Sequence, residues 1–244
     1  MTFYRYKIVV HYDGTNYHGW QIQKNHKTIQ GELEKAVSDF TSQNISICGS
    51  GRTDSGVHAN GQVANFYTDT NMKTSQIKDA INSVLPKDIH VNSCKFEDND
   101  FDARFSAISR QYVYKIMKEF NPFMRNYYWF LNYKIDHAKL IECSNIILGN
   151  HDFELFCKST SKQKNNHCNI SESKWFFEND TLCYQISSNR FLHHMVRMLV
   201  GTMIEVSKGT ITLSRFKDMV DLNIEKKNIV TSPPNGLYLD KVNY

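Results

Sequence analysis

The stretch Gly49–Phe66 reads GSGRTDSGVHANGQVANF and lies between two segments with strand-like patterns. The alternating Ile45–Ile47 segment precedes the stretch, and Gln62–Phe66 resumes a strand-like pattern at its end. Three glycines crowd its first part, and glycine permits positive φ angles and the close approach of a ligand. The stretch therefore predicts a tight loop between two strands.

This loop presents one guanidinium and one carboxylate, those of Arg52 and Asp54. In an extended backbone their i, i+2 spacing places both side chains on the same face. A nearby arginine keeps an aspartate ionised, which a carboxylate nucleophile requires. An aspartate before Ser-Gly is also ordinary turn chemistry, so an Asx turn that only ties down the loop is the alternative.

The composition is that of a globular protein of one large or two small domains, with 244 residues, 41% hydrophobic and 22% charged. No apolar run is long enough to span a bilayer, and no signal peptide is visible, so we expect a cytoplasmic protein without a membrane partner. The net charge of +4 permits nucleic-acid binding without demanding it. A basic loop around Lys158, Lys162 and Lys164 is interpreted as solvated surface.

The six cysteines are scattered without CxxC spacing, which predicts free buried thiols. His167-Cys168, with Cys157 upstream, is a weak candidate for half of a zinc site, because structural zinc needs four well-spaced ligands. We therefore expect neither a metal ion nor a cofactor.

The first hundred residues predict the order strand, helix, strand, strand, helix, strand. A ferredoxin-like α+β unit has this order. Thr28 is the expected cap of the first helix, and Pro86 ends the second. We expect one half over residues 1–102 and a second α+β half over 103–244. Outside the central loop, the elements expected in the first half are strands Tyr4–Tyr12 and Ile89–Phe96 and helices Ile29–Phe40 and Ser75–Leu85.

The second half begins with a predicted strand, Arg110–Ile116, on which Arg110, Tyr112 and Tyr114 share one face. Read from the residues alone, these tyrosines form a half-buried sheet face. Asp136 is expected to cap a helix that Gly149 ends, and Leu213–Leu222 is a further expected helix. The apolar residues expected to face inward are Leu140, Ile141, Ile147, Leu148, Phe216, Met219 and Val220.

The segment Asn189–Gly209 is also expected to be a helix, with a polar and small stripe along one side. A cationic stripe on a buried helix needs an anionic partner, either a phosphate or a carboxylate. Adjacent histidines on a helix point apart, which disfavours a metal site at His193 and His194. The stripe consists of Arg190, His193, His194, Arg197 and Gly201.

Several of these motifs, in this order along the chain, resemble those of the tRNA pseudouridine synthases of the TruA type. The central match is GRTDSGVHANGQVANF, in which Ser55 stands where the family usually has alanine. The segments YDGTNYHGWQIQ, ARFSA, RQYVY, HDF, FLHHMVR and PPNGLYL support it. The resemblance implies an isomerase that converts uridine to pseudouridine at positions 38, 39 and 40 of the anticodon stem-loop.

The resemblance also assigns roles to residues of this chain. Asp54 corresponds to the catalytic nucleophile, Arg197 to its charge partner, and Tyr112 to the tyrosine that packs against the target base. It implies a homodimer of chains with two ferredoxin-like halves, whose antiparallel sheets join and enclose the active-site cleft. The residues expected to bind substrate are Arg52, His58, Arg110 and Tyr112.

Two other functions are weighed against this one. A module that binds tRNA without catalysis is disfavoured by the joint presence of Asp54, Tyr112 and Arg197. A carboxylate-dependent glycosidase usually needs two facing carboxylates, whereas the central loop offers one.

Overall fold

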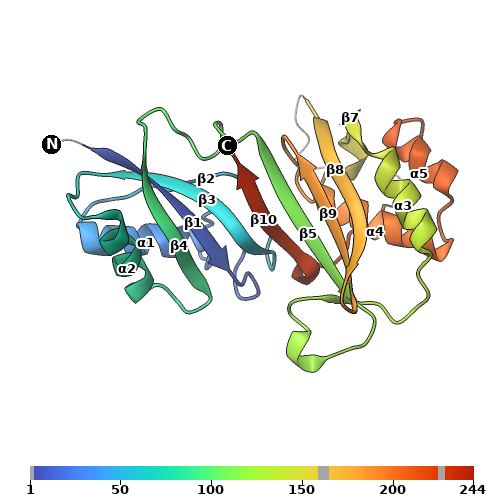
Figure 1. Ribbon diagram of the computed structural model, residues 1–244, viewed down its shortest axis with the longest axis horizontal. Helices are drawn as coiled ribbons and strands as arrows, with labels where there is room; N and C mark the ends of the chain where they lie inside the picture. The colour runs from blue at the N-terminus through green and yellow to red at the C-terminus, as the bar shows by residue number, and fades with distance from the viewer. Residues whose placement is uncertain (1–2, 159–164, 225–228) are drawn as a thin grey trace. The chain divides into compact units, whose positions relative to one another are not determined.

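The computed structural model describes residues 3–158, 165–224 and 229–244. The chain forms two compact units, Met1–Ile108 with Tyr238–Tyr244, and Ser109–Leu237. Figure 1 shows the course of the chain through both units. Lys162 and Lys164 of the basic loop lie outside the described residues, and Lys158 is exposed.

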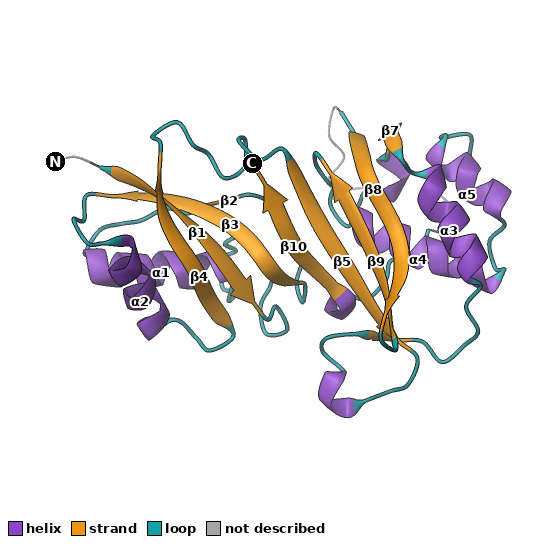
Figure 2. Cartoon of the chain, viewed as in Figure 1, coloured by secondary structure: helices purple, strands orange, loops and turns teal. Residues whose placement is uncertain are grey.

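The first unit is a twisted sheet with two helices. Its long strands are antiparallel, with β1 (Tyr4–Tyr12) between β4 (Ile89–Glu97) and β3 (His58–Thr68). On its other side β3 pairs with the short β2 (Cys48–Gly49) and, in parallel, with β10 (Leu237–Asn243). Figure 2 shows α1 (Ile29–Thr41) and α2 (Thr74–Val84) beside these strands.

The alternation of β1 explains how this unit is layered. Tyr6, Ile8 and Val10 are fully buried, whereas the residues between them are partly exposed. Thr28 caps α1 as predicted, because its side chain accepts a hydrogen bond from the N–H of Gly31. The predicted order of strands and helices is confirmed in this unit.

The second unit has an antiparallel sheet in the order β5 (Ser109–Met117), β9 (Thr181–Ser188), β8 (His167–Glu178), β7 (Gly149–Asp152). The short β6 (Trp129–Phe130) lies parallel to the end of β5. Its three α-helices within the described residues are α3 (His137–Ile146), α4 (Met195–Lys208) and α5 (Leu213–Val220). Short 3-10 turns occur at Pro122–Met124, Glu154–Phe156 and Pro234–Gly236.

Some expected elements are placed differently. Ile45–Ile47 is not a strand; the two paired residues are Cys48 and Gly49. Helix α3 has its predicted Asp136 cap, but Ile141 lies on its uncovered face and is 51% exposed, and Leu148, which follows the helix, is 40% exposed. The helix ends at Ile146, and Gly149, with φ of +94°, begins β7 instead.

Among the described residues, no helix combines the length and the apolar character that crossing a membrane would require.

Candidate active site

The predicted loop lies between β2 and β3 and closes in a tight turn, Asp54–Val57. The N–H of Val57 donates to the carbonyl of Asp54 at 3.2 Å. Gly56 has φ of +77°, a left-handed conformation that residues with a side chain rarely adopt. The sequence therefore needs glycine at position 56, and the turn holds Asp54 at its first position.

The segment 12–20, which carries the YDGTNYHGW motif, supports this loop. Trp20 donates from its backbone N–H to the carbonyl of Thr53 at 3.1 Å, and the hydroxyls of Tyr12 and Thr53 lie 2.8 Å apart. A Cβ on Gly49 would lie 2.5 Å from the Trp20 ring, which is 2% exposed. Trp20 is therefore a core residue, and it packs against the start of the loop. Burial raises the pKa of the Tyr12 phenol, so this hydroxyl stays protonated.

The Asp54 carboxylate is not needed for the turn. In an Asx turn it would accept from the N–H two residues on, that of Gly56. That N–H donates instead to the carbonyl of Tyr17 at 3.3 Å. Asp13 gives the contrast, because its carboxylate accepts from both the N–H and the hydroxyl of Thr15. The position of the half-buried Asp54 is thus fixed by backbone hydrogen bonds of the turn.

Exposure alternates along the loop, because Arg52 is exposed, Thr53 is buried and Asp54 is half-buried. This pattern favours the expected common side for Arg52 and Asp54. Ser55 donates from its hydroxyl to the carbonyl of Tyr17 at 3.1 Å. The departure from the family's usual alanine therefore adds one hydrogen bond to the turn.

His58 lies in the interior beneath the loop, with 1% of its surface exposed. Its Nδ1 accepts from the N–H of Gly14 at 3.1 Å, and its ring stacks on Tyr238 with centroids 4.7 Å apart. These contacts give His58 a supporting position, and its contact with substrate remains a prediction.

In the second unit, Arg110, Tyr112 and Tyr114 follow one another at alternate positions of β5, as predicted. Arg110 donates from Nη1 to the carbonyl of Asn189 at 2.9 Å. Tyr112 is 8% exposed and meets the Phe191 ring edge to face at 5.1 Å, whereas Tyr114 is fully buried. Of the two tyrosines, Tyr112 is therefore the one at the margin of the core.

The predicted helix Asn189–Gly209 is wrong at its beginning. Helix α4 starts only at Met195, because His194 has φ of +65°, and a left-handed residue interrupts the helical path. Arg190 and His193 therefore precede the helix, and the imidazoles of His193 and His194 meet edge to face at 4.4 Å. Of the expected stripe, α4 itself carries Arg197 and Gly201.

Arg197 lies in the first turn of α4 and is held by the segment 230–234. Its Nε donates to the carbonyl of Ser232 at 2.9 Å, and the N–H of Ser232 donates to the carbonyl of Arg197 at 3.0 Å. Glycine inside a helix is unfavourable by roughly 1 kcal/mol relative to alanine. Gly201 has a packing reason, because a Cβ there would lie 2.3 Å from the carbonyl oxygen of Val230.

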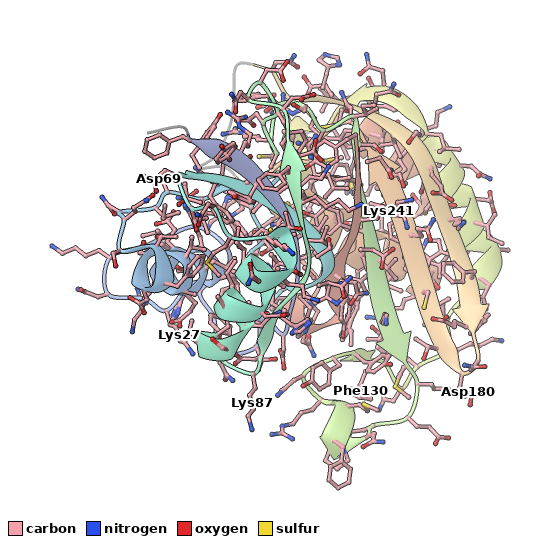
Figure 3. The ribbon with its side chains drawn as sticks, turned by 60° about the vertical axis from the view of Figure 1, so that its left-hand side comes forward. Lys27, Asp69, Lys87, Phe130, Asp180 and Lys241 are labelled. Atoms are coloured by element: carbon pink, nitrogen blue, oxygen red, sulfur yellow. The ribbon has the colours of Figure 1, made fainter. Side chains whose placement is uncertain are left out.

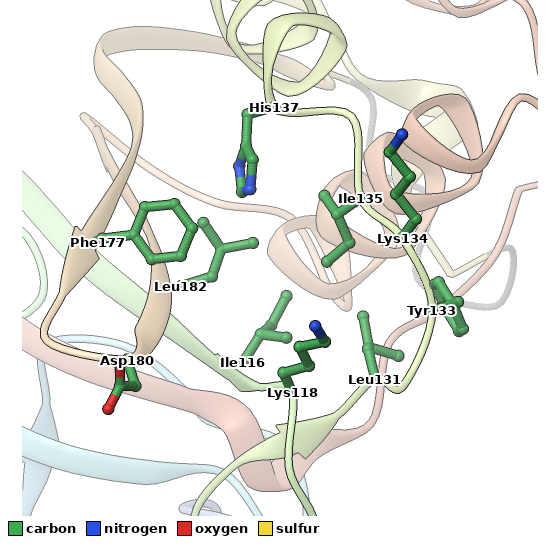
Figure 4. Close-up of a pocket in the computed structure, with 10 residues that line it drawn as sticks. All are labelled: Ile116, Lys118, Leu131, Tyr133, Lys134, Ile135, His137, Phe177, Asp180 and Leu182. Carbon is green, nitrogen blue, oxygen red and sulfur yellow. The ribbon is translucent and has the colours of Figure 1, made fainter.

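A separate cavity of about 240 Å³ lies in the second unit and is lined by none of the predicted site residues. Figure 4 shows the Lys118 amino group and the His137 ring turned toward it, and Asp180 turned away. Figure 3 places Asp180 at the turn between β8 and β9. The apolar lining includes Ile116, Leu131, Ile135, Phe177 and Leu182.

Cys157, His167 and Cys168 do not form a cluster of possible metal ligands among the described residues. All six cysteines are free thiols; five are buried and Cys48 is half-buried. Cys168 is buried on β8, whereas the adjacent His167 is exposed. Neighbouring strand residues point to opposite faces, so these two side chains do not share a ligand site.

Comparison with known proteins identifies the class. The family model described as tRNA pseudouridine synthase matches residues 8–106 and 145–244. The chain belongs to this family, so the predicted family and the predicted enzyme class, an isomerase acting on tRNA, are confirmed.

Three similar proteins within this family carry the name tRNA pseudouridine synthase A. The chain is 40% identical to tRNA pseudouridine synthase A of Thermoanaerobacter sp. (strain X514), over 97% of this chain and 98% of that protein. The protein of the same name from Acetivibrio thermocellus is 36% identical over 98% of both chains. That of Ehrlichia chaffeensis is 38% identical over 98% of this chain and 100% of its own.

The sequence pattern alone does not identify the residues that support the site. Tyr12 and Tyr17 lie in the YDGTNYHGWQIQ motif and Thr53 in GRTDSGVHANGQVANF, and no other feature of the sequence points to them. Around Ser232 the sequence predicts only a turn, because two prolines follow it. Gly201 lies on the predicted polar and small stripe, and a small residue there is the feature of the sequence that indicates a close approach of another segment to α4.

Proposed function

We propose that Asp54 is the catalytic residue with which this tRNA pseudouridine synthase isomerises uridine. The observation that carries the proposal is the Asp54–Val57 turn, in which a backbone hydrogen bond and the left-handed Gly56 fix the backbone that carries the half-buried carboxylate. A half-buried carboxylate on a loop whose backbone is fixed is suited to act as a nucleophile or base.

The conversion of uridine to pseudouridine is an isomerisation, so it involves no net oxidation or reduction and needs no second reactant to balance it. The N1–C1′ bond of uridine breaks, the uracil turns, and a C5–C1′ bond forms while the C5 hydrogen is lost and N1 gains a proton. Asp54 attacks or deprotonates the nucleoside, and its ionised form is the reactive one. A positive partner favours that form, which is the role we propose for Arg197.

The remaining roles follow from the family resemblance. Tyr112 packs against the uracil, and Arg52 and Arg110 bind the RNA near the target nucleotide. A uridine paired in a stem must be extruded before reaction, which favours an aromatic group at the site. The targets are positions 38, 39 and 40 of the anticodon stem-loop.

The same resemblance favours a homodimer working in the cytoplasm. It also favours the finer fold description, two ferredoxin-like halves with joined sheets and a cleft between them. The strand order β4–β1–β3, with β2 beside β3, supports that description for the first unit.

Asp54→Asn tests the proposal. The amide is nearly isosteric and the turn is held by backbone groups, so melting temperature and tRNA affinity should stay close to those of the parent. Tritium release from C5-labelled uridine in tRNA should fall below detection, because an amide cannot act as nucleophile or base. A folded Asp54→Asn variant releasing tritium near the parent rate would refute the role. A parent that binds tRNA without releasing tritium would favour a non-catalytic binding module.

A further inference from the structure

We infer that the 230–234 segment positions Arg197 for the reaction, with Gly201 and Tyr114 as the residues that hold the segment in place. The inference rests on the proposed role of Arg197 and extends it to residues that do not touch the reacting atoms.

The link between the segment and Arg197 is reciprocal. Arg197 Nε donates to the carbonyl of Ser232 at 2.9 Å, and the N–H of Ser232 donates back to the Arg197 carbonyl at 3.0 Å. An arginine side chain has many rotamers, and fixing Nε sets the direction of the guanidinium plane. A planar fork in a set direction can pair with a carboxylate through two parallel hydrogen bonds.

The segment is itself held from two sides. On the helix side, Gly201 lets the backbone approach, since a Cβ there would be 2.3 Å from the carbonyl oxygen of Val230 and 2.9 Å from the nitrogen of Ser232. On the sheet side, the hydroxyl of Tyr114 donates to the carbonyl of Pro233 at 2.8 Å. Burial raises the pKa of this phenol, so the donor is retained at working pH.

The segment's own sequence makes it stiff. Ser232 precedes Pro233 and is therefore biased toward an extended conformation, and two successive prolines have fixed φ angles. Ser232 is fully buried although it lies in a segment without regular structure. A stiff, buried segment bound to one guanidinium is a positioning element rather than an ordinary connection.

Two substitutions disturb the segment without altering Arg197. Gly201→Ala introduces a methyl group against backbone atoms, so the segment must move by a few tenths of an ångström or more. Tyr114→Phe removes the hydroxyl that holds Pro233. The matched control is Tyr184→Phe, because Tyr184 pairs with Tyr114 across β9 and β5, is equally buried, and lies 2.8 Å from the hydroxyl of Ser173.

We expect kcat to fall about 5-fold in Tyr114→Phe, the equivalent of one hydrogen bond, and up to about 100-fold in Gly201→Ala, with KM for tRNA little changed. The acidic limb of the kcat/KM profile should shift to higher pH, because a displaced guanidinium stabilises the carboxylate less. Tyr184→Phe should lower the melting temperature by about 2–4 °C, as should Tyr114→Phe, and leave kcat and the pH profile unchanged.

Nuclear magnetic resonance gives a readout independent of activity. The Arg197 Nε–H should exchange slowly with water in the parent and in Tyr184→Phe, and faster in Gly201→Ala. Unchanged exchange and an unchanged pH profile in a folded Gly201→Ala variant would overturn the inference, as would an equal loss of kcat in Tyr184→Phe. Parent and Asp54→Asn, assayed alongside, report separately on the proposed function, which stands or falls by their tritium release.

Discussion

Gly19→Ala is the sharpest test of how the loop before Asp54 is held. Gly19 has φ of +84°, and a Cβ there would lie 2.4 Å from the carbonyl oxygen of Thr53. The left-handed conformation costs an alanine roughly 1–2 kcal/mol, and the contact adds roughly 1–3 kcal/mol because backbone must move. We expect a loss of about 2–5 kcal/mol in the free energy of unfolding.

Gly209→Ala is the matched control, because Gly209 has nearly the same φ, +83°, and a Cβ there meets nothing within 4 Å. It should lose only the conformational part, about 1–2 kcal/mol. Urea unfolding measures both losses, and tritium release from tRNA measures the rate.

The two variants should separate clearly in activity. Gly19→Ala moves the residue directly before Asp54, and a displacement near 1 Å lowers kcat by up to about 100-fold. Gly209→Ala should keep the parent kcat. A Gly19→Ala enzyme that is folded and fully active would refute the claim that the 12–20 segment positions Asp54, as would an equal loss of kcat in the control.

Other outcomes follow from the same contacts. If the Tyr112 hydroxyl transfers a proton, Tyr112→Phe should bind tRNA and lose turnover. Near-normal turnover in Tyr112→Phe together with an inactive Tyr112→Ala would indicate that Tyr112 only stacks on the base. Full activity of Tyr112→Ala would show that Tyr112 is not part of the site. Arg197→Met should cripple the enzyme, because it removes the positive partner proposed for the Asp54 carboxylate; a Met variant with the parent rate would contradict the pairing. Burial raises the thiol pKa of Cys94 and Cys143 to about 12 and of Cys168 and Cys183 to about 11 from 9.0. Stability should therefore be full below pH 9 and fall as the pH rises through 11, and a melting temperature that stays flat from pH 8 to 11 would contradict this. Affinity for tRNA should fall with rising salt, and activity lost in EDTA and restored only by zinc would contradict metal-free chemistry.

The sequence predicted best those elements whose local patterns agree with their packing. The strand Tyr4–Tyr12 matches its observed bounds, and α1 begins after Thr28, because cap and apolar stripe coincide there. The Asp54 loop was found from its glycines, of which Gly56 has the positive φ that such loops use.

The failures arise where tertiary contacts override local pattern. The apolar and cationic residues from Asn189 onward fit a helix, yet His194 adopts a left-handed conformation and α4 begins after it. No local rule reports that a distant carbonyl, that of Ser232, will bind Arg197. The outward position of Ile141 likewise depends on which neighbours cover α3, and periodicity alone does not give that.

The late position of β10 in the sequence affects how the first unit folds during synthesis. Tyr238 and Leu239 pair with His58 and Ala59 at the beginning of β3, immediately after the loop that carries Asp54. At ribosomal speeds of about 5–20 residues per second, Tyr238 and Leu239 are translated on the order of ten seconds after Ile108, and until then this edge of the first unit lacks its neighbour. A nascent or prematurely terminated chain therefore carries Asp54 on a sheet whose adjoining edge is open. The support that β10 gives to the strand after the Asp54 loop can therefore form only after the whole second unit has been translated.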